Sequence, residues 1–377
     1  MSISMKVARL VKVGQPLEPG TAEKPTTIGP NDVLVRVAAC GLVPNTPNVL
    51  NGLYPFPLQQ LPAIFGLDVS GTIEAIGAHV LNLKVGDRCY VNPHLTCGTC
   101  PLCRKNRRDL CLNGCLRGYF AMSEGGAKML AQYPIGGLSE YVVSPDVNIA
   151  LLPENIDFKT ASRLGYIGTS FGALKRGDLG PSKTILINGV TGTLGVSAVA
   201  IALGFGATKI LGIGRNKERL EQVERMSSQT GRIVTLSSED DTDPVAWVKQ
   251  QTNGLGVDMM YDCLGAGGSA NSTDAFIKNG AIRVGGKALL AAGGAEGQIS
   301  ASYSEWMNKD TAVLGSMWFT NQEADEMISL IAAGVIDFSF LEHETFELED
   351  VNKALKVVGG RPGGFKNVVV MVGEKSE

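Results

Sequence analysis

Four cysteines between residues 97 and 111 have the spacing of a metal site. The segment CGTCPLCRKNRRDLC places Cys97, Cys100, Cys103 and Cys111 in a C-x2-C-x2-C-x7-C pattern. Turns of this kind bring thiolates together at about 2.3 Å from a tetrahedral zinc ion. Four thiolates close the ion to water and substrate, so the pattern predicts a structural zinc. Free thiols and disulfides are the alternatives, and Cys115 is a substitute ligand with a less suitable spacing.

A glycine-rich turn forms a second candidate site. GVTGTLG, residues 189–195, follows the apolar run KTILIN and precedes VSAVAIALGFGA, which has helical spacing. Between a strand and a helix, Gly192 lets backbone N–H groups approach a pyrophosphate, and Gly195 permits close packing. The spacing differs from the usual G-x-G-x-x-G, and a purely structural turn is the alternative. The residues predicted to bind a dinucleotide here are Gly189, Thr191, Gly192, Thr193, Leu194 and Gly195.

The end of the next strand, KILGIG, indicates which dinucleotide binds. An acidic residue at this point would bind the ribose 2′-hydroxyl of NAD. The chain instead has Gly214, Arg215, Asn216 and Lys217. A small residue leaves space for a 2′-phosphate and an arginine can bind it through two hydrogen bonds, so we predict NADPH. The alternative is that Arg215 and Lys217 only begin a solvated helix.

Length and composition limit the possible classes of protein. With 377 residues, two domains are the natural expectation. The net charge is −3 and the longest basic run is RKNRR, so we expect no nucleic-acid or anionic membrane partner. The N-terminus does not resemble a signal peptide and no apolar run is long enough to cross a membrane. We therefore expect a cytoplasmic protein, in which clustered cysteines bind metal.

Alternating strands and helices must position the glycine turn. Strand-like runs such as GRIVTL, VDMMYDCLG, KALLAAGG and TAVLGSMWF continue to about residue 317. This alternation predicts an α/β fold with a doubly wound parallel sheet. Cys263, at the end of one strand, is expected to pack beside the cofactor and not to act as a nucleophile, because no histidine lies nearby in the sequence.

Taken together, these features resemble the medium-chain dehydrogenase/reductase superfamily of zinc alcohol dehydrogenases and quinone oxidoreductases. The resemblance spans nearly the whole chain and rests on the cysteine segment, the INGVTGTLG turn and five further segments: NDVLVRVAACGL, FGLDVSGTIEAIGAHVLNLKVGDRCYV, GGLSEYVV, YDCLG and GGFKNVVVMV. It implies a GroES-like, β-rich catalytic domain over residues 1–155, a Rossmann domain over 156–316 and a return to the first domain over 317–377. It also implies a homodimer or homotetramer.

The ligands of the family's catalytic zinc are missing from this sequence. By resemblance, their positions are Val43 in CGLVPN, Leu67 in FGLDVSG and Gly165 in SRLGYIG, and none of these side chains donates an electron pair. Asp68 alone remains as an oxygen donor, and one donor cannot hold an open tetrahedral zinc. The alternative is that Cys40 or Cys89 supplies a zinc ligand in place of a missing one. We therefore predict that the catalytic zinc is absent and that Val43 and Leu67 line the substrate pocket.

Without zinc, the substrate oxygen needs a proton or a strong hydrogen bond. GLYP resembles the zinc-free quinone oxidoreductases, in which a tyrosine of this turn faces the cleft, so Tyr54 is the first candidate donor. The alternative is an aromatic plug in a proline-rich turn. Asn45 and Thr46 occupy the positions where the zinc enzymes begin their proton relay, and Asn45 can bind a substrate oxygen without ionising.

The resemblance also implies further cofactor and substrate contacts. Thr169, Ala292 and Gly293 fall where the family contacts nicotinamide, and Lys366 matches a basic residue near the pyrophosphate, with a surface lysine as the alternative. Trp318, flanked by Met317 and Phe319, is predicted to line an apolar substrate pocket, although an aromatic run at a strand end is as often part of the core.

The sequence therefore predicts an NADPH-dependent, zinc-independent carbonyl reductase or alcohol dehydrogenase acting on a small apolar substrate. Reduction of a conjugated C=C bond or of an imine is the first alternative. A non-catalytic NADPH-binding protein is the alternative from another class.

Overall fold

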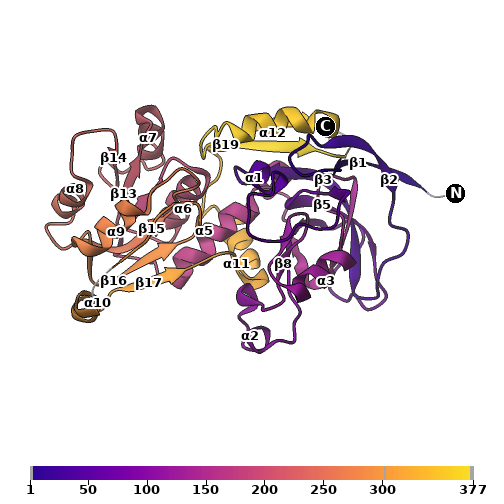
Figure 1. Cartoon of the computed structure of the whole chain (residues 1–377), viewed down its shortest axis with the longest axis horizontal. Coiled ribbons are helices and arrows are strands. Elements are labelled where there is room, and N and C mark those ends of the chain that lie inside the picture. The colour runs from indigo at the N-terminus through magenta and orange to yellow at the C-terminus, as the bar shows by residue number, and fades with distance from the viewer. Residues whose placement is uncertain (1–2, 301–302, 374–377) are drawn as a thin grey trace.

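The computed structural model describes residues 3–300 and 303–373. Two lobes, each built on a large β-sheet, lie side by side along the longest axis of the molecule (Figure 1). Helices α5 (Leu164–Arg176) and α11 (Asn321–Ala332) lie between them (Figure 1). We therefore expect the cofactor and substrate site where the two lobes face each other.

The first lobe is a β-rich domain. Its main sheet has the order β11-β6-β5-β3-β19-β18, with β10 paired to β3. The central strand β3 reads DVLVRVAACGL and is almost entirely buried, as expected for a run of β-branched and small apolar residues. The strands of this sheet are β3 (Asp32–Leu42), β5 (Asp68–Ile76), β6 (Arg88–Val91), β10 (Tyr141–Pro145), β11 (Ile149–Leu151), β18 (Glu342–Glu347) and β19 (Lys366–Met371).

Two three-stranded sheets and four short helices complete this lobe. One sheet has the order β2-β1-β4 and the other, beside the cysteine segment, has the order β7-β8-β9. Their strands are β1 (Ser4–Leu10), β2 (Glu18–Glu23), β4 (Ala63–Ile64), β7 (His94–Leu95), β8 (Cys115–Leu116) and β9 (Phe120–Ala121). The helices are α1 (Thr46–Leu50), α2 (Pro101–Arg104), α3 (Glu124–Gln132) and α4 (Phe158–Ala161).

The second lobe confirms the predicted doubly wound sheet. All its strands are parallel and have the order β14-β13-β12-β15-β16-β17, which is the Rossmann order. The strands are β12 (Thr184–Asn188), β13 (Lys209–Gly214), β14 (Ile233–Ser237), β15 (Val257–Asp262), β16 (Ile282–Leu290) and β17 (Ala312–Gly315). The helices are α5, α6 (Thr193–Gly204), α7 (Lys217–Glu224), α8 (Pro244–Gln251), α9 (Ala270–Lys278) and α10 (Tyr303–Lys309).

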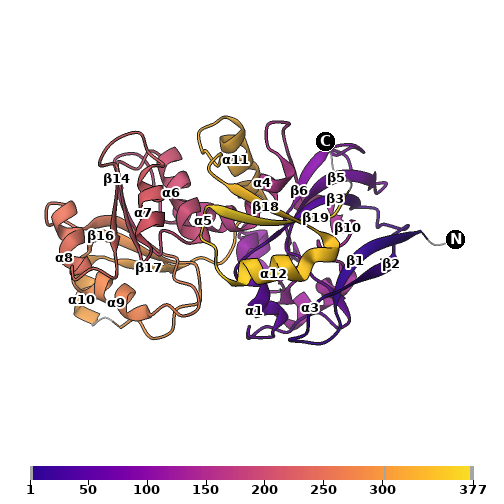
Figure 2. The same ribbon diagram turned by 90° about the horizontal axis from the view of Figure 1, so that it is seen from above.

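The C-terminal segment returns to the first lobe. β19 pairs with the central strand β3 in antiparallel register, and β18 pairs with β19 in parallel. Helix α12 (Val351–Gly359) connects these two strands and lies alongside them (Figure 2). Within the described part of the chain, no helix is long and apolar enough to cross a membrane.

Candidate active site

A cleft of about 460 Å³ opens between the two lobes, beyond the carboxyl ends of the neighbouring strands β12 and β15, where the strand order reverses. In a doubly wound sheet, ligands bind at this switch point, beyond the carboxyl ends of the strands. The predicted cofactor residues that line it are Gly189, Thr191, Gly192, Thr193, Leu194, Gly214, Arg215, Cys263 and Ala292. Pro44, Asn45 and Tyr166 also line it. The cleft can therefore hold a dinucleotide with its reactive end beside these three residues.

The glycine turn has the close contacts expected of a pyrophosphate-binding turn. Gly189 has a φ of +89°, and Gly192 caps the N-terminus of the 12-residue helix α6. A Cβ on Gly195 would lie 2.4 Å from the Gly189 carbonyl oxygen, so any larger residue would push the helix away from the strand. The N-terminal N–H groups of α6 face the cleft and favour a negative charge.

The far end of the cleft is basic. Gly214, Arg215 and Arg219 line it together with Ser238. A Cβ on Gly214 would lie 3.1 Å from the Leu220 side chain, so a larger residue here would require that side chain to shift. Sequence reasoning missed Arg219 and Ser238; the signal for Arg219 was its place four residues after Arg215, one helical turn away.

Several predicted cofactor residues lie outside the lining of the cleft, and most of them have another structural partner. The Thr169 hydroxyl donates to the Gly165 carbonyl within α5, at 2.9 Å. Asn216 caps α7 by accepting from the Arg219 backbone N–H at 2.9 Å. Gly195, as described above, packs α6 against the turn, and Gly293 is an exposed residue with a φ of +61° next to Ala292.

Two predicted cofactor lysines form ion pairs away from the cleft. Lys217 lies 2.7 Å from Asp240, and Lys366 lies 2.8 Å from Glu344 on the neighbouring strand β18. In the place predicted for Lys366 near the pyrophosphate, the structure has Arg361 and Gly363. The backbone N–H of Gly364 donates to the Thr191 carbonyl at 2.9 Å, so this connection packs directly on the glycine turn.

The positions of the family's catalytic zinc ligands are filled by buried protein groups. Val43 and Leu67 belong to the hydrophobic core and do not line the cleft. A Cβ on Gly165 would lie 1.9 Å from an Asp68 carboxylate oxygen, so that carboxylate occupies the space where a third ligand would be. The residues present therefore do not fit a catalytic zinc.

Asp68 is fully buried in a polar cluster below the cleft. Its Oδ1 accepts a hydrogen bond from the Tyr90 hydroxyl at 3.0 Å, and its Oδ2 has no hydrogen-bond partner among the described residues. Burial raises the pKa of Asp68 to about 7, although the Tyr90 hydrogen bond and the Arg163 charge act in the opposite direction. Arg163 is also buried, and burial lowers its pKa to about 10. Two buried ionisable groups, Asp68 and Arg163, therefore lie close to Gly165.

The three predicted catalytic residues have different surroundings. Asn45 lines the cleft at the start of α1. Thr46 is buried, and its hydroxyl is 2.5 Å from that of Tyr119. Tyr54 is outside the lining and stacks on Phe120, with ring centroids 5.3 Å apart. The tyrosine that does line the cleft is Tyr166, which sequence reasoning missed although it directly follows Gly165.

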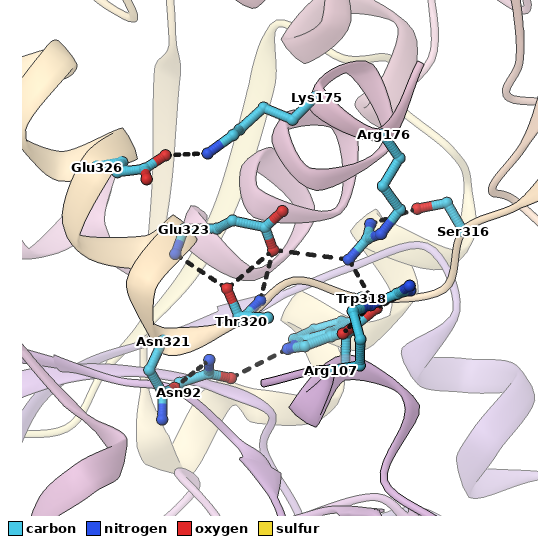
Figure 3. Close-up of polar contacts among 11 residues, drawn as sticks. Asn92, Arg107, Lys175, Arg176, Ser316, Trp318, Thr320, Asn321, Glu323 and Glu326 are labelled. Atoms are coloured by element: carbon cyan, nitrogen blue, oxygen red, sulfur yellow. Dashed lines mark hydrogen bonds and ion pairs between the residues drawn. The ribbon is translucent and has the colours of Figure 1, made fainter. Parts of the chain in front are cut away.

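Trp318 lies between the lobes and outside the lining of the cleft. Its indole N–H donates to Asn92 Oδ1 at 3.0 Å (Figure 3). Its ring stacks on Phe319, with ring centroids 5.2 Å apart. A Cβ on Gly168 would lie 2.4 Å from the Phe319 ring, so this aromatic pair packs tightly against α5. The tryptophan predicted for the substrate pocket is thus a buried contact between the lobes.

An ionic network beside Trp318 joins the cysteine segment to α5 and α11. Arg176 of α5 donates to Asp109 at 3.1 Å and to Ser316 at 2.7 Å, and lies 3.6 Å from Glu323 (Figure 3). Arg107 also binds Asp109, at 2.8 Å. The cysteine segment is therefore held against the cofactor domain.

The cysteine segment forms one compact cluster. The Sγ atoms of Cys97, Cys100, Cys103 and Cys111 lie within 4.8 Å of one another, and those of Cys97 and Cys111 are 3.6 Å apart. Sulfurs bound to one tetrahedral zinc lie about 3.8 Å apart, so the set fits a zinc ion. Burial raises the pKa of Cys97, but backbone N–H donors outweigh it and lower the pKa to about 5, which favours the thiolate.

Comparison with known proteins identifies the family. Residues 29–154 match the alcohol dehydrogenase GroES-like domain, and residues 193–333 match the zinc-binding dehydrogenase family. Together these matches cover more than half of the chain. The chain belongs to the medium-chain dehydrogenase/reductase superfamily and is an oxidoreductase of that superfamily.

Individual relatives span nearly the whole chain. A sorbitol dehydrogenase of Bacillus subtilis is 26% identical over 92% of this chain and 90% of its own length. The alcohol dehydrogenase TADH from Thermus sp. ATN1 has a TM-score of 0.83 at 24% identity, covering 98% of this chain and 100% of its own. A putative zinc-binding dehydrogenase from Sinorhizobium meliloti, bound to NADP, has a TM-score of 0.79 at 22% identity, covering 98% and 99%. At these identities the two solved structures establish the shared fold.

Proposed function

We propose that the chain is an NADPH-dependent oxidoreductase that transfers hydride between nicotinamide and a small apolar carbonyl or alcohol without a catalytic zinc. One observation carries the proposal: the Asp68 carboxylate fills the space beside Gly165 where a metal ligand would be. Among residues 3–300 and 303–373, the cysteine cluster is the only group of three or more metal-binding side chains. Hydride transfer itself depends on positioning, so a zinc-free route is physically available.

The basic end of the cleft supports the choice of NADPH. Arg215 and Arg219 line the pocket beyond β13, and Ser238 adds a hydroxyl donor. A 2′-phosphate could accept hydrogen bonds from both guanidinium groups, which are stronger than bonds between neutral groups.

Different residues of this chain would bind the cofactor, pack beside its nicotinamide and hold the structural zinc. When bound, a nicotinamide cofactor supplies or accepts the hydride. The glycine turn and the N-terminus of α6 would bind the pyrophosphate, while Cys263 and Ala292 would pack beside the nicotinamide. Burial raises the pKa of Cys263, which keeps its thiol protonated and supports a packing role. The four cysteines of the lobe would hold a structural zinc, closed to substrate.

Metal content and turnover together test this proposal. Zinc per chain is measured, and NADPH oxidation is assayed with a saturated aldehyde, the matching enal and a cyclic imine, before and after treatment with a chelator. We expect one zinc per chain and aldehyde reduction that survives chelation. Two zincs and chelator-sensitive turnover would contradict the zinc-free mechanism. Product identification separates C=O from C=C or C=N reduction, and NADPH binding without any turnover would favour the non-catalytic alternative.

A further inference from the structure

We propose that Tyr166 is the catalytic proton donor to the substrate oxygen. This inference rests on the proposed function, because it names the acid that the reduction of a carbonyl requires. It replaces the role that the sequence gave to Tyr54.

The place of Tyr166 in the cleft supports this assignment. Tyr166 lies in the first turn of α5, and it lines the cleft together with Asn45 from the first lobe and Cys263 and Ala292 from the second. It is partly exposed, whereas the residues before and after it in the helix are buried. A substrate bound beside the nicotinamide would therefore lie next to the Tyr166 side chain.

The two neighbouring tyrosines are less suited to the role. The Tyr119 hydroxyl is buried and shares a hydrogen bond of 2.5 Å with Thr46. Tyr54 stacks on Phe120 and is outside the lining of the cleft. Of the tyrosines that surround the position of the missing zinc, Tyr166 is the one placed to reach a bound substrate.

The groups around Tyr166 keep it protonated while offering a compensating positive charge. Burial raises the pKa of Tyr166, and the nearby Tyr54 and Asp68 raise it further. The Arg163 charge and a hydrogen-bonding contact with Asn45 act in the opposite direction. The hydroxyl is therefore a donor throughout the neutral range, and Arg163 faces the charge that develops when the proton leaves.

The proposed step balances in atoms and charge. Hydride addition to the carbonyl carbon breaks the C=O π bond and moves its electron pair to the oxygen. The proton leaves Tyr166 Oη, forms the O–H bond of the alcohol and leaves a phenolate. A proton from bulk solvent then reaches the phenolate through water in the open cleft and restores Tyr166. Overall, hydride transfer oxidises the nicotinamide and reduces the carbonyl, and one solvent proton is consumed.

Removal of single hydroxyls tests the assignment. The variants Tyr166→Phe and Tyr54→Phe and the distant control Tyr133→Phe are each assayed with the aldehyde that the wild type reduces fastest. Loss of a general acid should lower kcat by roughly a hundredfold or more in Tyr166→Phe. NADPH affinity, measured by the fluorescence of the bound nicotinamide, should stay within about twofold, and inhibition by the matching amide, a carbonyl mimic that is not reduced, should weaken about tenfold.

A second replacement preserves the fold and changes only acidity. Incorporation of 3,5-difluorotyrosine at position 166 lowers the pKa of the phenol, so kcat should begin to fall at a lower alkaline pH than in the wild type. An unchanged kcat in Tyr166→Phe, or an unchanged pH profile with difluorotyrosine, would overturn the assignment while leaving the proposed function intact. A wild type that binds NADPH but reduces nothing in the panel would overturn the proposed function, and this inference with it.

Discussion

At the scale of single residues, the most unusual group is the buried carboxyl of Asp68. It lies beside Gly165, with one oxygen bound to Tyr90 and the other without a partner among the described residues. A carboxylate in such a place is costly, because few hydrogen-bond donors replace its lost hydration.

Asp68 should make the stability of the protein depend on pH. Burial raises its pKa from 3.8 to about 7, so between these values the folded chain holds a proton that the unfolded chain has lost. The free energy of unfolding should therefore fall as pH rises from about 4 to about 7. Asp68→Asn removes this titrating group, so its free energy of unfolding should exceed that of the wild type by about 1–4 kcal/mol between pH 5 and pH 8. Urea unfolding at pH 5 and pH 8 measures the free energy of unfolding of each variant. Glu154→Gln, which changes an exposed residue, is the control. The same change in free energy of unfolding in both variants would contradict the explanation.

Cofactor choice should depend on two arginines. Arg215→Ala and Arg219→Ala should each raise KM for NADPH by about ten- to a hundredfold, because each removes a charge-assisted bond to the 2′-phosphate. KM for NADH should change little. Steady-state kinetics with both cofactors checks this, and Arg225→Ala, which removes an exposed arginine at the end of the same helix, is the control. Equal use of NADH and NADPH by the wild type would contradict the prediction.

At the scale of elements, helix α5 connects three parts of the molecule. Its first turn carries Tyr166 into the cleft, its middle packs on Phe319, and its last residue, Arg176, binds Asp109 beside the cysteine cluster. Asp109 is 4% exposed, and although burial alone would raise its pKa, its bond to Arg107 and the Arg176 charge lower it. The cysteine segment thus supports the helix that presents the proposed proton donor.

Arg176→Met should destabilise the protein by about 1–3 kcal/mol, since it leaves a buried carboxylate with one partner fewer. The midpoint of urea unfolding measures the change. The control is Lys6→Met, which breaks the exposed pair with Glu349 and should leave the midpoint of urea unfolding nearly unchanged. A similar loss of stability in the two variants would show that the burial of Asp109 does not strengthen its interaction with Arg176.

At the scale of the whole molecule, the fold could largely be predicted and part of the site could not. The apolar strands, the glycine turn and the four cysteines depend on local sequence, so their roles follow from spacing. The setting of Trp318 depends on Asn92, and that of Lys366 depends on Glu344, which come from other elements. Tyr166 was missed because its exposure is decided by the packing of two lobes, which no local pattern records.

The pairing of β19 with β3 has a consequence for synthesis of the protein on the ribosome. The central strand β3 ends at Leu42, but its neighbour β19 begins only at Lys366. At about 5–20 residues per second, tens of seconds separate the two strands. During that time only the end of β3 that pairs with β19, Ala39–Leu42, has no partner on this edge, because Asp32–Arg36 can pair with β10. The strands of the second lobe, all from residues 184–315, can already pair. The second lobe can therefore finish folding before the first, and the nascent N-terminal lobe is the part of the chain most in need of a chaperone.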